Sequence, residues 1–304
     1  MKLELKDIHK SFDGKEVLKG INFSVESGRA LGLLGRNGAG KTTSIRIIMD
    51  IFRANAGEVL LDGKLFEPSK KQVGYLPEER GMYPKKTVLE QMVYFARLRG
   101  LDKKTAVESA KKWLGRLQIA EHEKRKMDTL SKGNQQKVQL ATTLVCDPDI
   151  VVLDEPFSGL DPVNSQILKD VIRERIASGK IVIFSSHQMS YVEEFCEDVV
   201  IINQGEVVLQ GSLDVIKHEY GQGKKILSAL NLTLDELEQH LGKLTDLVQI
   251  EGRNKYNVIF RLKDGIDQWK VLERLKAEGI EIDTYGSYEP SLNDIFVSCV
   301  GKEA

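Results

Sequence analysis

Short apolar or alternating segments recur through the first two thirds of the chain and predict strands. They cover residues 2–9, 17–25, 31–34, 58–62, 150–153 and 181–184, with a hairpin around Gly205 formed by residues 199–203 and 206–210. The segments 150–153 and 181–184 are apolar throughout, which is typical of central strands in a parallel sheet covered on both faces. The first part of the chain is therefore predicted to be an α/β domain.

A helical pattern replaces the strand pattern between about residues 84 and 135. Residues 87–90 read Thr-Val-Leu-Glu, a capping box that starts a helix. Two apolar stripes at helical spacing follow. The first consists of Val88, Leu89, Met92, Val93 and Ala96, and the second of Ala106, Ala110, Trp113, Leu114 and Leu117. These stripes predict a helical subdomain.

A second domain is predicted after a break at residues 220–223, where two glycines add the backbone freedom of a hinge. Strands are expected at 225–230, 247–251, 257–262 and 280–285, and helices at 234–241, 266–278 and 291–300. This β-α-β-β-α-β order is the split βαβ arrangement. We expect one domain at residues 1–220 and a small α+β domain at 221–304 that supplies no chemistry.

The segment 35–42 reads Gly-Arg-Asn-Gly-Ala-Gly-Lys-Thr, follows the apolar run 30–34 and opens a helix. This strand–loop–helix context favours a phosphate-binding P-loop over an ordinary glycine-rich turn. Backbone N–H groups of such a loop point at phosphate oxygens, and the helix N-terminus favours their charge. Nucleotide contacts are expected from Gly35, Arg36, Asn37, Gly38, Ala39, Gly40, Lys41, Thr42 and Thr43. Lys41 is expected to reach the β- and γ-phosphates, and Thr42 to ligate Mg²⁺.

Asp154 and Glu155 follow the apolar strand 150–153. Adjacent carboxylates are usually solvated charge, but ligands of parallel sheets bind beyond the carboxyl ends of the strands. Asp154 is therefore expected to hold Mg²⁺ through water. Glu155 is expected to polarise the attacking water, as a general base or an orienting group.

The segment 130–136, Leu-Ser-Lys-Gly-Asn-Gln-Gln, precedes a predicted helix and then this acidic strand. That order resembles the signature helix and Walker B strand of ATP-binding-cassette (ABC) ATPases, and the resemblance covers about residues 1–220. It implies that Ser131, Lys132 and Gly133 contact the nucleotide held by a second copy. Two chains would then close on ATP as a clamp.

The same resemblance implies roles for further residues. Asp161, in the segment 158–161, matches the D-loop along the seam between the two copies. His187 resembles the switch histidine that contacts the γ-phosphate, and it is a catalytic candidate with Lys41 and Glu155. Phe12 matches the aromatic residue that stacks on adenine, although an aromatic residue in a strand–turn is commonly part of the core.

Three positions depart from the commonest pattern of the family. Glu78 stands where the Q-loop has glutamine; it is expected to bind Mg²⁺ or a water, and an ionised carboxylate donates no hydrogen bond. Lys132 and Asn134 replace the usual glycine and glutamine of the signature. With the tail 289–296, these changes resemble ATPase subunits of sodium-extrusion and drug-resistance type exporters.

The resemblance implies a P-loop NTPase fold with a mixed central sheet, an antiparallel β subdomain and a helical subdomain. The implied activity is ATP hydrolysis with Mg²⁺, coupled to transport. A translation- or repair-type ABC protein would carry two cassettes or a basic arm, and a small-molecule kinase would not need segments 130–136 and 158–161. A non-hydrolysing regulatory dimerisation module would be expected to lack Glu155 or His187.

Composition limits the partners. Lysine and arginine number 44 against 45 acidic residues, so the net charge of −1 gives no indication of nucleic-acid binding. The sequence has no apolar run near the roughly 20 residues that span a bilayer, and three distant cysteines fit a reducing cytosol. We expect a separate membrane-spanning permease subunit, with this chain on the inner face of the membrane as a homodimer or a heterodimer with another ATPase subunit.

Overall fold

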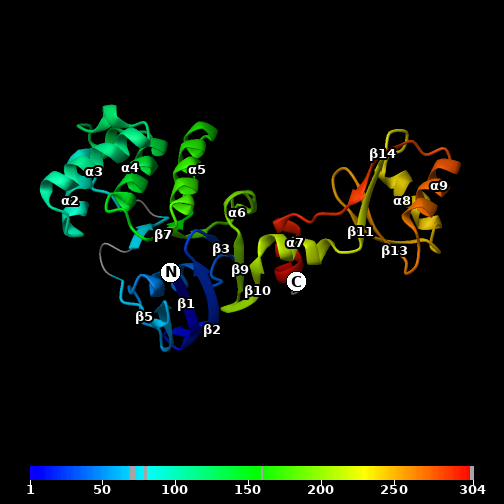
Figure 1. Cartoon of the computed structure of the whole chain (residues 1–304), viewed down its shortest axis with the longest axis horizontal. Helices are drawn as coiled ribbons and strands as arrows, with labels where there is room; N and C mark the ends of the chain where they lie inside the picture. The colour runs from blue at the N-terminus through cyan, green and yellow to red at the C-terminus, as the bar shows by residue number, and fades with distance from the viewer. Residues whose placement is uncertain (69–72, 79–80, 159, 302–304) are drawn as a thin grey trace. The chain divides into compact units, whose positions relative to one another are not determined.

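The computed structural model describes residues 1–68, 73–78, 81–158 and 160–301. These residues form two compact units that divide between Leu213 and Asp214 (Figure 1). The division falls before the predicted break at 220–223, because the break itself lies at the end of a helix, α7 (Leu213–Gly221), most of which belongs to the second unit.

A six-stranded sheet forms the centre of the first unit, in the order β10-β9-β3-β8-β7-β6. Its strands are β3 (Ala30–Leu34), β6 (Val73–Leu76), β7 (Ile150–Asp154), β8 (Ile181–Ser185), β9 (Asp198–Asn203) and β10 (Glu206–Ser212). All neighbours pair in parallel except β9 and β10, which form the predicted hairpin. Every residue of β3, β7 and β8 is buried, which confirms the central strands predicted at 150–153 and 181–184.

A second, antiparallel sheet in the order β2-β1-β4-β5 packs against this one. It contains β1 (Lys2–Phe12), β2 (Lys15–Glu26), β4 (Ala56–Leu61) and β5 (Lys64–Leu65). One hydrophobic core joins Leu3 and Phe23 of this sheet to Leu33 and Ile183 of the six-stranded sheet and to Ile45 of α1 (Lys41–Ile48). Both elements that flank the loop between β3 and α1 are therefore anchored in this core, which fixes the two ends of the loop.

Helices make up the remainder of the first unit. They are α2 (Val88–Leu98), α3 (Lys103–Arg116), α4 (Lys132–Leu144), α5 (Pro162–Ala177) and α6 (Met189–Phe195), with short 3₁₀ turns at Ala120–His122 and Met127–Thr129. The capping box of Thr87 and Glu90 is present at the start of α2. Residues 136–144 of α4 are all buried, so this part of the helix has no polar face and shows no helical periodicity in the sequence.

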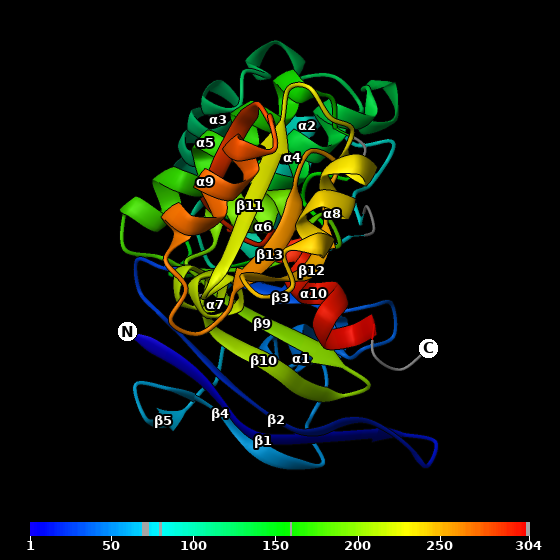
Figure 2. The ribbon, with the colours of Figure 1, turned by 90° about the vertical axis from the view of Figure 1, so that its right-hand side faces the viewer.

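The second unit contains the predicted β-α-β-β-α-β order. Its elements are β11 (Lys224–Ala229), α8 (Leu234–Lys243), β12 (Val248–Arg253), β13 (Val258–Leu262), α9 (Gln268–Ala277), β14 (Ile282–Ser287) and α10 (Leu292–Val300). The sheet is antiparallel, in the order β12-β13-β11-β14. Residues of α8 and α9 share one core with Leu227 and Phe260, so both helices pack on the same face of the sheet (Figure 2).

Candidate functional site

The loop between β3 and α1 has the backbone shape expected of a phosphate-binding loop. Gly40 has φ of 116°, and a Cβ there would lie 2.5 Å from Leu18 Cδ2. Gly35 has φ of 156°, and a Cβ there would lie 2.4 Å from the carbonyl oxygen of Ile202. Both distances are well inside van der Waals contact, so only glycine fits between the loop and its neighbouring strands.

The Lys41 ammonium lies over this loop. Its Nζ donates to the carbonyl oxygens of Gly35 at 2.7 Å and Arg36 at 3.2 Å. Burial lowers the pKa of Lys41, and the carboxylates of Glu155, Asp154 and Glu78 act in the opposite direction. The structure thus brings the predicted phosphate-binding lysine within electrostatic reach of all three predicted acidic residues.

Asp154 ends β7 and is 3 % exposed. Its register partner on β8 is Ser185, whose hydroxyl donates to Asp154 Oδ1. Tyr75 lies on the other neighbouring strand, β6, and the Asp154 carboxylate is one cause of the upward shift in its pKa. Burial is the larger cause, and together they raise the pKa of Tyr75 to about 12. The Asp154 carboxylate is therefore enclosed by strand residues on both sides.

Glu155 is 8 % exposed and has a left-handed backbone, with φ of 49°. Its Oε1 accepts the backbone N–H of His187 at 2.8 Å, and His187 Nδ1 also lies 2.8 Å from Oε1. Its Oε2 accepts the hydroxyl of Ser186 at 3.2 Å. The structure therefore joins two of the predicted catalytic residues, Glu155 and His187, directly.

Ser185, Ser186 and Tyr75 are site residues that sequence reasoning did not identify. The two serines stand between a predicted strand and His187, and the tyrosine lies on the strand before Glu78. The sequence did contain one signal: a pair of serines follows the predicted strand 181–184, just as a pair of carboxylates follows the predicted strand 150–153. That signal becomes usable only when the strands are known to be neighbours in register.

Phe12 and Glu78 lie at the rim of the first unit. Phe12 ends β1, is 37 % exposed, and meets Phe52 edge-on with 5.2 Å between ring centroids. Lys10 Nζ lies 5.0 Å from the Phe12 centroid. Glu78 is exposed and follows β6 at the same edge of the sheet as Asp154. Phe12 is thus partly packed, with the rest of its ring open to a ligand.

The residues predicted to contact a second copy lie at two helix N-termini. Ser131 caps α4 by accepting the N–H of Asn134 at 3.3 Å, and Asp161 caps α5 by accepting the N–H of Asn164 at 2.9 Å. The Asn164 N–H also lowers the pKa of Asp161. Within the described ranges, no hydrogen bond or ion pair joins Ser131, Lys132 or Asp161 to the phosphate loop. Gly159 of the predicted D-loop lies outside those ranges.

Gly133 has a packing role in addition to any contact with nucleotide. It is buried, and a Cβ there would lie 2.9 Å from Asn164 Nδ2. Three residues later, the buried Gln136 side chain donates to the carbonyl oxygen of Pro156 at 3.1 Å. Helix α4 is therefore in close contact with α5 and with the segment that follows Glu155.

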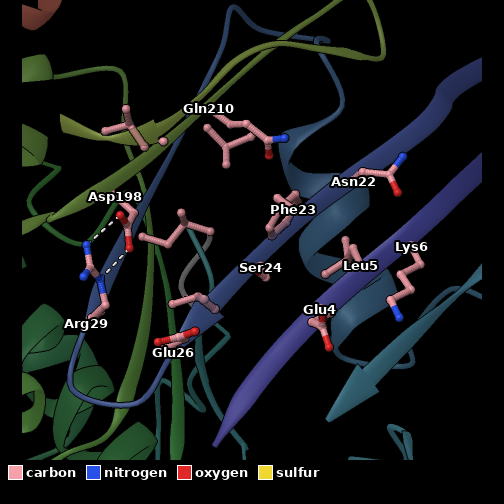
Figure 3. Close-up of a pocket in the computed structure, with 15 residues that line it drawn as sticks. Glu4, Leu5, Lys6, Asn22, Phe23, Ser24, Glu26, Arg29, Asp198 and Gln210 are labelled. Atoms are coloured by element: carbon pink, nitrogen blue, oxygen red, sulfur yellow. Dashed lines mark hydrogen bonds and ion pairs between the residues drawn. The ribbon is translucent and has the colours of Figure 1, made fainter. Parts of the chain in front are cut away.

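A separate hollow of about 570 Å³ lies between β1–β2 and β9–β10 (Figure 3). Its arginine, Arg29, is held by Asp198 through two hydrogen bonds of 2.7 Å. Glu4, Lys6 and Glu26 also line it, so its charges are mixed in sign. This hollow does not have the chemistry of a phosphate site.

The described residues contain no group of three or more histidine, cysteine or acidic side chains arranged to hold a metal ion. Among the same residues, no helix is long and apolar enough to cross a bilayer.

Comparisons with known proteins identify the family of the chain. Residues 18–158 match a family model described as ABC transporter, and residues 211–300 match one described as ATP-binding protein DrrA1-3-like, C-terminal domain. The uncharacterized ABC transporter ATP-binding protein YhaQ of Bacillus subtilis strain 168 is 38 % identical over 301 residues, which cover 98 % of each chain. The ABC transporter ATP-binding protein NatA of the same organism is 36 % identical over 70 % of this chain and 90 % of its own length.

A solved ATP-binding subunit of an ABC transporter superposes with a TM-score of 0.67 at 28 % identity, over 80 % of this chain and all of its own length. The sequence relatives, the family models and the fold thus all indicate an ABC transporter ATP-binding subunit, which is consistent with the predicted P-loop core. The chain belongs to the ATP-binding subunits of ABC transporters, which bind and hydrolyse ATP and work with membrane permease subunits.

Proposed function

We propose that this subunit drives export by closing around ATP and Mg²⁺ as a dimer, with hydrolysis reopening the dimer. The observation that carries the proposal is the convergence of Lys41 with Asp154, Glu155 and Glu78 at the carboxyl edge of the central sheet. A cation over a glycine-rich loop suits the β- and γ-phosphates, and the carboxylates suit a metal ion and a water.

The residues present fit Mg²⁺. This ion prefers oxygen ligands, keeps several waters, and is usually bound through one or two carboxylates together with substrate phosphates. Asp154 is a buried carboxylate that accepts a hydrogen bond from the Ser185 hydroxyl and also interacts with Tyr75. A carboxylate has about four acceptor positions, so lone pairs remain for metal-bound water. Thr42, at the start of α1, would be a direct ligand and Glu78 an outer one. Bound Mg²⁺ would neutralise charge that develops on the phosphate oxygens.

Glu155 and His187 would act on the attacking water and the γ-phosphate. The left-handed backbone at Glu155 turns it away from the β7 direction, and its carboxylate contacts the His187 ring. His187 is 64 % exposed in its side chain, so the ring has a free side that is available to a phosphate. Glu155 would take the proton from water, and His187 would contact the γ-phosphate.

The dimer is proposed because, among the described residues, Ser131, Lys132 and Asp161 make no hydrogen bond or ion pair with the phosphate loop of their own chain. Ser131 and Lys132 are exposed at the N-terminus of α4, where the helix dipole favours a phosphate. A second copy, identical or a related ATPase subunit, would bring these residues and Asp161 to the ATP held by Lys41. Phe12 would stack on the adenine of that ATP.

Export is proposed from the relatives. A linearmycin resistance ATP-binding protein, LnrL of Bacillus subtilis strain 168, is 28 % identical over 99 % of this chain and 98 % of its own length. A Nod factor export ATP-binding protein of Burkholderia lata is 31 % identical over 69 % of this chain. The first name describes resistance to a compound, and the second describes export of one.

The permease would dock on an exposed aromatic surface of the helical subdomain. Tyr83, Tyr94 and Leu98 are each about half exposed, and Tyr83 stacks on Phe95 with 6.0 Å between centroids. Exposed aromatic residues that are already held by one another lose little entropy on binding, and they are enriched at protein interfaces. Docking there would place the chain on the inner face of the membrane.

Replacing Tyr94 by glutamate should place a charge in the interface with the permease. The share of the protein that sediments with membranes prepared from the cells that produce it should then fall by at least about fivefold. The ATPase rate of the purified chain should not change. The matched control is Tyr256→Glu, which alters another exposed tyrosine in the second unit. Unchanged sedimentation of the Tyr94 variant would show that the permease binds elsewhere.

A fragment containing residues 1–220 should fold and bind ATP with an affinity within about threefold of the full chain, since the sheet and the phosphate loop are complete without the second unit. Calorimetric titration with ATP and thermal melting of both proteins would test this. Lys41→Ala in the fragment is the control for specific binding. A folded fragment that binds no ATP would mean that the second unit contributes to the site.

A further inference from the structure

Two serines at the end of β8 face the two carboxylates at the end of β7. Asp154 and Ser185 are register partners in the parallel β7–β8 ladder. Paired residues of neighbouring strands point to the same side of the sheet, and Ser185 Oγ donates to Asp154 Oδ1. One residue further, Ser186 Oγ donates to Glu155 Oε2 at 3.2 Å. The acidic pair Asp154–Glu155 is thus matched by a hydroxyl pair, Ser185–Ser186.

The direction of these hydrogen bonds is determined by the partners. An ionised carboxylate only accepts, so each serine must be the donor. Ser186 Oγ in addition accepts the backbone N–H of Gln188 at 3.0 Å, which orients its own hydrogen toward Glu155. Ser185 and Ser186 are 0 % and 2 % exposed, so water does not compete for either hydroxyl.

Glu155 depends on these contacts for its orientation. Its backbone lies in the left-handed region, which non-glycine residues rarely occupy. The Glu155 N–H donates to the carbonyl oxygen of Ser185 at 3.0 Å, so the backbone is fixed and the direction of the carboxylate depends on its side-chain contacts. Oε1 is held by His187 and Oε2 by Ser186. Removing the Ser186 hydroxyl would leave one carboxylate oxygen free to rotate about the contact with His187.

We propose that Ser185 and Ser186 are positioning residues for hydrolysis, with Ser186 orienting the Glu155 carboxylate toward water and Ser185 orienting the Asp154 carboxylate toward Mg²⁺. The inference rests on the roles proposed above for Asp154 and Glu155. The two serines have different targets, so their loss has different kinetic effects.

Ser186→Ala should lower kcat roughly tenfold, because a small displacement of a reacting group is costly, while KM for ATP changes by less than about twofold. Ser186→Thr retains the hydroxyl and should recover most of the lost rate. If the added methyl group prevents folding, Ser186→Cys keeps only a weak donor and should give an intermediate rate. Steady-state kinetics at saturating Mg²⁺ provide the measurement.

Ser185→Ala should raise about tenfold the Mg²⁺ concentration at which half of the Mg²⁺-dependent increase in melting temperature is reached. This is expected when a residue that orients a metal-bound carboxylate is lost. This is measured without turnover, from the Mg²⁺ dependence of the melting temperature in the presence of a non-hydrolysable ATP analogue. The same titration with Ser186→Ala should match the unmodified chain.

Ser228→Ala is the matched control, because Ser228 is another buried serine that donates to a carboxylate, that of Asp283 at 3.0 Å, in the second unit. It should change neither kcat nor Mg²⁺ dependence. Glu155→Gln separates the two proposals: if it hydrolyses ATP normally, the role of Glu155 is wrong. If it is inactive while folded Ser186→Ala retains full kcat, or Ser185→Ala retains normal Mg²⁺ dependence, the positioning role is wrong.

Discussion

Replacing Glu155 by glutamine should lower the rate of ATP hydrolysis by two to three orders of magnitude, on the order of 3–4 kcal/mol in the barrier. Glutamine keeps the size of the side chain, and its carbonyl oxygen can still accept the N–H of His187, which Glu155 Oε1 accepts at 2.8 Å. An amide cannot take a proton from water at neutral pH. ATP binding should persist, because Lys41 and the phosphate loop are unchanged.

Phosphate release under steady-state conditions measures the rate, and equilibrium titration with ATP measures the affinity. Glu174→Gln is the control, since Glu174 is an exposed glutamate of the same unit that pairs with Arg116 on its surface. Because slow hydrolysis preserves the closed state, light scattering of the Glu155 variant should show a dimer with ATP and none without it. Near-normal hydrolysis by the pure variant would contradict the assigned role.

The elements around the phosphate loop could be predicted because their signals are local. The strands 150–153 and 181–184 are apolar throughout, and the structure has them fully buried as β7 and β8. The capping box at Thr87 and the stripes on α2 and α3 were equally readable. Each of these features depends on residues that are near one another in the sequence.

Other parts of the fold lacked such a signal. Residues 136–144 of α4 are buried on every side, so no polar face marks the helix. Helix α7 extends into the segment 220–223, where two glycines had favoured a hinge: Gly221 is its last residue, and Gly223, with φ of 73°, follows it. The domain boundary therefore remains a prediction at 220, while the compact units divide at 213.

The candidate site shows the same difference between local and distant information. Motif spacing named Lys41, Asp154, Glu155 and His187, which the structure brings together. The contacts of Tyr75, Ser185 and Ser186 depend on β6 and β8 both being neighbours of β7. Strand order and register depend on residues that are far apart in the sequence. No local pattern in this sequence therefore indicates which strands are neighbours or which of their residues are paired.

Mixing a Lys41→Ala chain with a Ser131→Arg chain should restore hydrolysis that neither chain has alone. In each mixed dimer, one composite site combines both lesions and the other combines the intact Lys41 with the intact Ser131. Random pairing of equal amounts makes about half of the dimers mixed, and each mixed two-fold dimer has one intact site out of two. Roughly a quarter of the normal rate is therefore expected. Lys41→Ala removes the ammonium that the phosphates require, and Ser131→Arg places a large side chain at the start of α4, where Ser131 caps the helix.

A chain that carries both changes is the matched control. Mixed with either single variant it contributes two defective half-sites, so no dimer contains an intact composite site and no rate should return. The rate in the productive mixture should also rise more steeply than protein concentration, since it requires association of two chains. If each single variant is folded and inactive, yet mixing restores nothing at concentrations where Glu155→Gln dimerises with ATP, Ser131 does not act on the partner's nucleotide. The exposed N-terminus of α4 would then have its role within one chain, and the clamp would have to be built from other surfaces.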